Sequence, residues 1–179
     1  MKSLTKFALI AGASIAGGML SAGGAAAQGN LTVYCGVQEE WCQAMVNAFQ
    51  KETGITVAMT RKSAGEVYAQ VAAEAANPKG DIWWGGTGDP HLQAAEEGLT
   101  LEYESPMLKD LQPWAIDQYN NGKKRTVGIY LGALGFGYNA DLLKQKNLPA
   151  PKCWADLAKP AYKGEVQVAN PNSSGTAYN

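Results

Sequence analysis

The chain has 179 residues, with 15 Lys and Arg against 16 Asp and Glu, and a formal net charge of −1. This mild acidity, with no basic stripe, argues against nucleic acid or an anionic membrane surface as the main partner. One histidine and three scattered cysteines make no zinc-binding set.

The first 27 residues have the pattern of a secretory signal peptide. Lys2 and Lys6 give a positive start, residues 7–20 are apolar, and Ala25–Ala27 provides the small residues that signal peptidase accepts. A membrane-spanning helix is the competing interpretation, but the apolar run is short and broken by glycines. We therefore expect cleavage after Ala27 and a soluble, exported, periplasmic protein. From residue 28 onward, 13 basic and 16 acidic residues remain, a net charge of about −3.

The three cysteines would lie in an oxidising compartment, where disulfides form. Cys35 ends a predicted strand, and Cys42 lies in the first turns of the predicted helix that follows. A disulfide can join them if their Cα atoms come within roughly 7 Å; two buried thiols are the alternative. Cys153 is then left over.

The region from residue 31 to residue 59 predicts a β-α-β unit. Trp41, Met45 and Phe49 recur every four residues and form one apolar stripe, which is typical of a helix. Gly54 is placed to end that helix in the left-handed conformation. The predicted elements are a strand at 31–34, a helix from Gln38, and a strand at 55–59.

The same alternation continues along the chain and predicts a mainly parallel sheet with helices on its faces. Asp89 followed by Pro90 has the pattern of a helix N-cap and first position. Residues 126–139 form a long extended segment with four glycines, which we interpret as a crossover between two lobes. The further predicted elements are helices at 65–76, 89–98, 105–119, 141–146 and 154–157, and strands at 81–84 and 165–168.

Three loops follow the carboxyl ends of predicted strands, the edge at which parallel sheets bind ligands. They span residues 35–38, 85–89 and 172–176. In the last loop, small residues expose backbone N–H groups beside hydroxyls, a combination that suits phosphate or carboxylate. Simple helix capping remains the alternative for this loop. The donor-rich residues are Ser173, Ser174, Gly175 and Thr176.

The turn at residues 85–88 offers a similar choice. Gly86 and Thr87 could cradle a ligand with backbone groups, or the turn could simply be tight; it lacks the Walker and dinucleotide spacings. His91 has the ordinary position of an exposed side chain in a first helical turn. The sequence has no G-x-S-x-G elbow and no Cys-His nucleophile signature. We therefore expect no enzyme activity and no cofactor.

Several stretches together carry a family resemblance that covers nearly the whole predicted mature chain. They are residues 31–34, 81–91, 132–139, 154–157, 163–164 and 170–177. The chain resembles the bacterial extracellular solute-binding proteins of the ferric-iron type. The resemblance implies an α/β, type II periplasmic binding fold with two mainly parallel lobes, the second incomplete here. The implied divisions are lobe 1 at 28–128, a hinge crossover strand at 129–136 and partial lobe 2 at 137–179.

The resemblance is weaker at the ligand residues. Ferric-iron members carry a metal-binding His where this chain has Gln38 and a Glu where it has Gly86, and their tyrosine pair would fall beyond Asn179. Ferric iron requires anionic oxygen ligands, which Gln38 and Gly86 do not supply. Residues 85–91 look more like the branch associated with sugar phosphates or other organophosphates. The resemblance thus favours a small anionic solute, with ferric iron plus a synergistic anion as the alternative.

The expected function is that of the periplasmic substrate-binding component of an ABC transporter. The lobes would close on the solute and present it to a permease in the inner membrane. We expect a monomer that binds no nucleic acid. A secreted hydrolase and a structural or adhesive exported protein are the alternatives from other classes. The expected ligand-binding residues are Gln38, Gly86, Thr87, Ser173, Ser174, Gly175 and Thr176.

Overall fold

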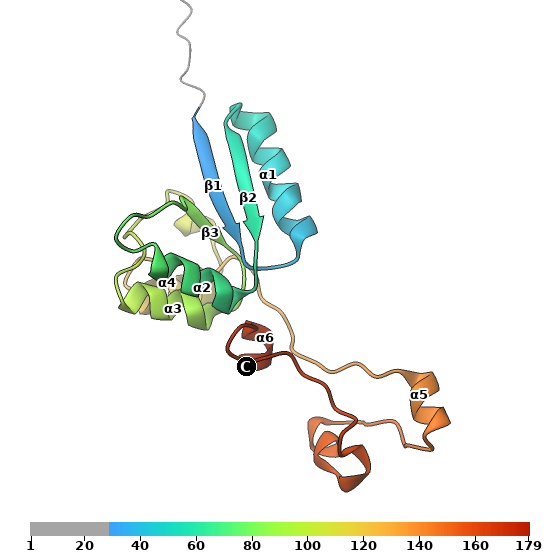
Figure 1. Cartoon of the computed structure of the whole chain (residues 1–179). Coiled ribbons are helices and arrows are strands. Elements are labelled where there is room, and N and C mark those ends of the chain that lie inside the picture. The colour runs from blue at the N-terminus through green and yellow to red at the C-terminus, as the bar shows by residue number, and fades with distance from the viewer. Residues whose placement is uncertain (1–28) are drawn as a thin grey trace, which may run out of the picture.

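A computed structural model describes residues 29–179, so the predicted signal segment and its cleavage site lie outside the described residues. Its centre is a three-stranded parallel sheet in the order β2-β1-β3 (Figure 1). The strands are β1 (Asn30–Cys35), β2 (Thr56–Arg61) and β3 (Ile82–Trp84). The predicted parallel α/β arrangement is confirmed.

The register of the sheet fixes where the loops emerge. Cys35 is the Cα partner of Arg61 on one side and of Trp84 on the other. All three strands therefore end at the same level. The loops that follow them start from one common edge of the sheet.

The first helix, α1 (Glu39–Thr53), has its ends where local signals place them. Gln38 is its N-cap, and two acidic residues occupy the first turn, where the helix dipole favours negative charge. Gly54 ends it with φ of +72° and donates its N–H to the Gln50 carbonyl at 2.9 Å.

The apolar stripe predicted for this helix does not face the sheet. The buried positions of α1 are Cys42 and Val46, whereas Trp41, Met45 and Phe49 are exposed. The face that a helix buries is only about 100° wide, and consecutive residues point about 100° apart. Trp41 and its neighbour Cys42 therefore cannot both face the sheet. Here the smaller pair packs inward.

Three further helices pack against one another, α2 (Ala64–Ala73) against α3 (Gly88–Glu96) and α3 against α4 (Pro113–Asn121) (Figure 1). The predicted N-cap at Asp89 is wrong. Thr87 is the N-cap of α3, and Asp89 lies inside the first turn. Both sites carry capping-type residues, and the extended backbone at Thr87, with φ −80° and ψ 159°, decides between them.

The rest of the chain departs most from the sequence-based expectations. The helix predicted at 105–119 is divided into the short helix η1 (Leu108–Asp110) and α4. The strand predicted at 165–168 does not form, since no strand of the described residues pairs with it. Residues 126–139 likewise form neither helix nor strand. The remaining elements are α5 (Ala140–Gln145), η2 (Trp154–Ala158), η3 (Pro160–Tyr162) and α6 (Gly175–Tyr178).

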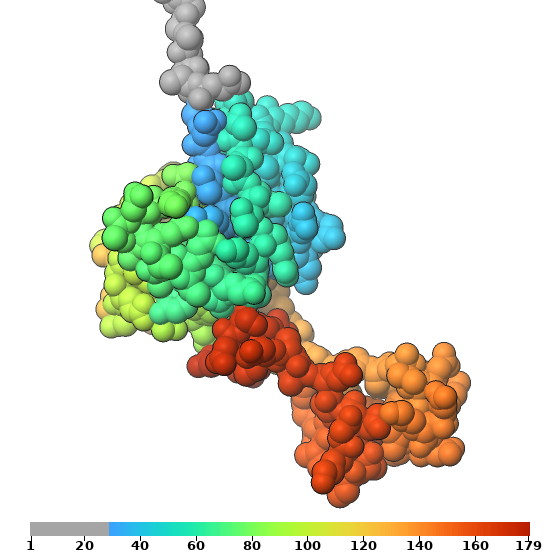
Figure 2. All heavy atoms as spheres, viewed as in Figure 1, coloured from blue at the N-terminus to red at the C-terminus, as the bar shows by residue number. Residues whose placement is uncertain are grey.

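After residue 131 the chain leaves the sheet-bearing body and later returns to it (Figure 1). Figures 1 and 2 show α5 and the two short helices after it standing apart, while α6 lies against the body beneath α2 and α3. The core of the body is built on β1, where Val33, Tyr34 and Cys35 are buried. Among residues 29–179, no helix has both the length and the apolar character needed to cross a membrane.

A disulfide fastens the end of β1 to the start of α1. It joins Cys35 and Cys42, whose Cα atoms are 6.1 Å apart. Both residues are buried, at 0% and 1% exposure. Cys153 is free and exposed.

Candidate functional site

The first two predicted loops are in contact at the carboxyl edge of the sheet. Gly36 donates its N–H to the Trp84 carbonyl at 2.9 Å. A Cβ on Gly36 would lie 2.5 Å from the Gly85 carbonyl oxygen, so only glycine allows this approach. Gly85 and Gly86 have φ of +79° and +105°, conformations that residues with side chains rarely adopt.

The third predicted loop lies against the second. A Cβ placed on Gly175 would collide with the Thr87 side chain. Gly65, in the first turn of α2, donates its N–H to the Ser173 carbonyl at 3.1 Å. The structure thus brings Thr87 and Ser173–Thr176 together across about 90 residues of sequence.

Hydroxyl groups at this contact have different partners. The Thr87 Oγ1 atom is buried and has no hydrogen-bond partner among residues 29–179. Ser174 caps α6 and accepts from the Ala177 N–H at 3.3 Å, while Ser173 donates to the Asn170 carbonyl at 3.2 Å. Ser174 therefore does serve as a cap, yet a hydroxyl that accepts one bond retains a proton to donate. Thr176 is exposed.

Gly86 is held by a residue that the sequence reasoning did not select. The Tyr130 hydroxyl accepts from the Gly86 N–H at 2.8 Å and donates to the Gly86 carbonyl at 3.0 Å. Gly86 therefore does not present a free N–H in this structure. Only one feature of the sequence could have pointed to Tyr130 as a site residue: it is an aromatic residue in the glycine-rich segment 126–139.

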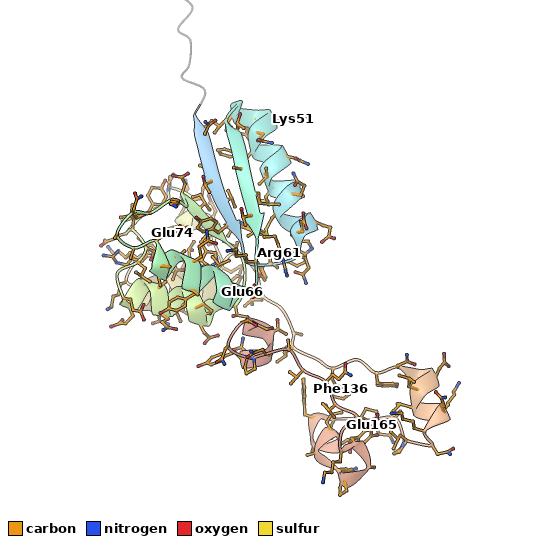
Figure 3. The ribbon with its side chains drawn as sticks, viewed as in Figure 1. Lys51, Arg61, Glu66, Glu74, Phe136 and Glu165 are labelled. Atoms are coloured by element: carbon orange, nitrogen blue, oxygen red, sulfur yellow. A yellow bond between two sulfur atoms is a disulfide. The ribbon has the colours of Figure 1, made fainter. Side chains whose placement is uncertain are left out.

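Positive charge at the same edge also escaped the sequence reasoning. Arg61 ends β2, and its Nε donates to the Val37 carbonyl at 3.0 Å, directly before Gln38. Gln38 itself is exposed. Figure 3 shows Arg61 where β2 ends, near the start of α2. Arg61 could have been found by asking which charged residue ends each predicted strand.

Local hydrogen bonds order the turn between β2 and α2. The Glu66 carboxylate accepts from Ser63 twice, from its N–H at 2.9 Å and its hydroxyl at 2.6 Å. These bonds, aided by the nearby positive charge of Lys62 and Arg61, lower the pKa of Glu66. Glu66 thus stays ionised at the helix N-terminus, where a negative charge is favourable.

His91 supports the turn from behind rather than standing exposed as expected. Its ring stacks on Trp83 with centroids 3.9 Å apart, and its Nε2 donates to the Gly85 carbonyl at 3.0 Å. Burial lowers the pKa of His91, so the imidazole is neutral near pH 7. The neutral, stacked His91 side chain therefore stabilises the turn.

A hollow of about 1000 Å³ borders the turn. Gly86, Thr87 and Tyr130 line it, together with apolar residues such as Trp83 and Trp114. Residues 173–176 are not among its walls. Within residues 29–179, no cluster of three or more His, Cys, Asp or Glu side chains is arranged to hold a metal ion.

The parallel sheet with its helices and carboxyl-edge loops has the arrangement of the type II periplasmic binding fold, which the solved structures compared below share. Residues 44–178 match the family described as bacterial extracellular solute-binding protein. The chain belongs to this family.

Solved structures agree with this assignment. The chain is similar to the periplasmic binding protein P5PA, at 40% identity and a TM-score of 0.78 over 84% of this chain and 48% of that one. It is also similar to the periplasmic binding protein AfuA from Actinobacillus pleuropneumoniae, whose structure has exogenous fructose-6-phosphate bound. That similarity has 37% identity and a TM-score of 0.78 over the same shares.

Among curated relatives, a protein of Salmonella typhimurium named "Putative 2-aminoethylphosphonate-binding periplasmic protein" is 34% identical over 140 residues. The match covers 76% of this chain and 37% of the relative. The chain spans half or less of the length of the curated relatives that it matches.

Proposed function

We propose that this protein is the periplasmic substrate-binding component of an ABC importer, and that it captures a small anionic organophosphate such as a sugar phosphate. The observation that carries the proposal is the contact between Thr87 and Gly175, which joins the two donor-bearing loops at the carboxyl edge of the sheet. The same ligand class is supported by the structure of AfuA with fructose-6-phosphate bound and by the relative named "Putative 2-aminoethylphosphonate-binding periplasmic protein". The role is capture and delivery to a permease, without catalysis.

The chemistry of this edge suits an anion. Thr87, Ser174 and Thr176 carry hydroxyls that can donate to phosphate oxygens, and the N–H groups of Gly175 and Thr176 lie beside them. The N–H groups of Ser173 and Ser174 already donate to the Asn170 carbonyl, at 3.1 and 2.9 Å. Arg61 adds a full positive charge, and a guanidinium binds phosphate in a forked geometry. Gln38 would offer a neutral amide, and Gly86 would shape the turn. A ferric ion would find no anionic oxygen at Gln38 or Gly86, so this alternative has less support.

Binding would couple to lobe closure. In this proposal residues 28–128 belong to lobe 1, residues 129–136 form the hinge crossover, and residues 137–179 belong to lobe 2. A solute that bridges the lobes favours the closed state by its differential affinity for that state. The protein would act as a monomer after cleavage behind Ala27.

Native mass spectrometry of the full-length protein, purified without stripping, tests the ligand class, because a retained solute is seen directly. Calorimetric titration with fructose 6-phosphate and 2-aminoethylphosphonate then gives affinities. Replacing Ser174 and Thr176 together by Ala should weaken binding by about 0.5–1.5 kcal/mol per lost neutral bond, and by more where the bond is to a charged oxygen.

The control is Ser105→Ala, because Ser105 lies outside the loops and its hydroxyl accepts from the Met107 N–H at 3.2 Å. This variant should bind like the wild type. Unchanged affinity in the double variant would remove the 173–176 loop from the site. Absence of saturable binding of any anion, or turnover of a phosphate ester, would overturn the proposal.

A further inference from the structure

A large aromatic side chain is exposed beside the proposed anion site. Trp41 follows Gln38 by three residues, and its N–H donates to the Gln38 carbonyl at 3.2 Å in the first turn of α1. Its side chain is 51% exposed. An exposed indole at this edge of a parallel sheet lies where ligands bind.

Tyr130 connects this indole to the glycine turn. The Trp41 and Tyr130 rings meet edge to face, with centroids 5.5 Å apart and an interplanar angle of 82°. The Tyr130 hydroxyl makes both of its hydrogen bonds to Gly86. The ring of Trp84, at the end of β3, also lies near Tyr130, at a centroid distance of 6.3 Å.

The position of Tyr130 is therefore fixed from three directions, by α1, by β3 and by the turn that leads to Thr87. Trp41 contacts the Tyr130 ring, and about half of its surface stays exposed to solvent. Trp41 lies in the first turn of α1, and the Tyr130 hydroxyl contacts the turn that leads to Thr87. Rigid aromatic groups give large contact area at low entropic cost.

We propose that Trp41 and Tyr130 form an aromatic wall that receives the carbon-bound part of the solute, while the hydroxyl loops hold its phosphate or phosphonate group. This inference rests on the proposed function and specifies the ligand as an organophosphate rather than a free anion. The C–H face of a sugar or a short carbon chain gains apolar contact against the rings, and an ammonium group gains cation–π attraction. Inorganic phosphate, which has no such part, gains nothing from the wall.

The test measures two affinities in the full-length protein: one for inorganic phosphate, and one for whichever of fructose 6-phosphate and 2-aminoethylphosphonate the wild type binds. Trp41→Ala should lower the affinity for the organophosphate roughly three- to tenfold, since aromatic contacts have energies of this order. The affinity for inorganic phosphate should stay within about twofold. Trp41→Phe, which keeps an aromatic face, should recover most of the loss.

A matched control separates a binding wall from general packing. Phe49→Ala removes a ring two turns further along the same exposed stripe of α1. This variant should leave both affinities unchanged.

The outcomes are distinguishable. Equal losses for the two ligands in Trp41→Ala, or no loss, would overturn the aromatic wall and leave the proposed function standing. A loss in Phe49→Ala as large as in Trp41→Ala would also overturn it, because the stripe would then act through packing. If the wild type binds no organophosphate, the proposed function itself fails.

Discussion

The Tyr130 hydroxyl bonds both backbone polar groups of Gly86, with its oxygen 2.8 Å from the amide nitrogen and 3.0 Å from the carbonyl oxygen. The two residues are 44 positions apart in the chain. A segment that follows the sheet-bearing body thus fixes the turn that presents Thr87. The shape of the candidate site depends on this clamp as much as on the local glycines.

Tyr130→Phe should loosen the turn. The change removes two hydrogen bonds and leaves partly buried backbone groups unpaired, which costs about 1–3 kcal/mol of unfolding free energy. Amide hydrogen exchange at Gly86 should accelerate, and the urea midpoint of the full-length protein should fall.

Tyr119→Phe is the matched control, since the buried Tyr119 hydroxyl has no partner among residues 29–179. Its removal should be neutral or slightly stabilising. Equal effects of the two changes would contradict a clamping role for Tyr130.

Gly175→Ala should push the hydroxyl loop away from the turn. The added methyl group would collide with the Thr87 side chain, which is short and branched and cannot move aside. Overpacking of this kind costs about 1–3 kcal/mol. Hydrogen exchange across residues 173–178 and urea unfolding measure the effect. Gly132→Ala meets no atom within 4 Å and should change neither, so a matching loss in that variant would argue against the contact.

Local signals predicted much of the fold. The β-α-β spacing, the acidic first turn of α1 and the left-handed position of Gly54 are encoded within a few residues, and the structure has them there. The prediction of a strand at 165–168 was wrong because residues with β propensity form a strand only when a partner strand is present. The prediction of Asp89 as the N-cap of α3 was wrong because Thr87, two residues earlier, is also a residue type that caps helices.

The candidate site was predictable only in part. Thr87 follows β3, so parallel topology alone places it at the carboxyl edge of the sheet. Ser173–Thr176 follow no strand in the structure, and the contact of Gly175 with Thr87 joins segments about 90 residues apart. The hydrogen bonds of Tyr130 to Gly86 join segments that are distant in sequence. The stack of His91 on Trp83 depends on the orientation of the two rings. No periodicity in the sequence carries that information.

The disulfide should stabilise the body by constraining the unfolded chain. Cys35 and Cys42 close a short loop with a separation of seven residues, which corresponds to about 2.5 kcal/mol in the chain-entropy estimate. Replacing both cysteines by Ser should lower the unfolding free energy by at least that amount, because both side chains are buried. Cys153→Ser, at an exposed free thiol, should have little effect. A double variant as stable as the wild type would mean that the bridge is absent from the native protein.

Stability should decline on the acid side of neutrality because of His91. Burial lowers the pKa of His91 in the folded state, while the unfolded chain has the ordinary value of about 6.5. Above that pH both states hold a neutral imidazole, so the full contribution is present. As the pH falls below about 6.5, the unfolded state takes up a proton that the folded state refuses, and the unfolding free energy decreases. His91 is the single histidine of the chain, so its NMR titration is unambiguous. His91→Phe, which keeps a ring against Trp83, should remove this part of the pH dependence; a titration midpoint at or above 6.5 in the folded protein would contradict the buried, neutral histidine.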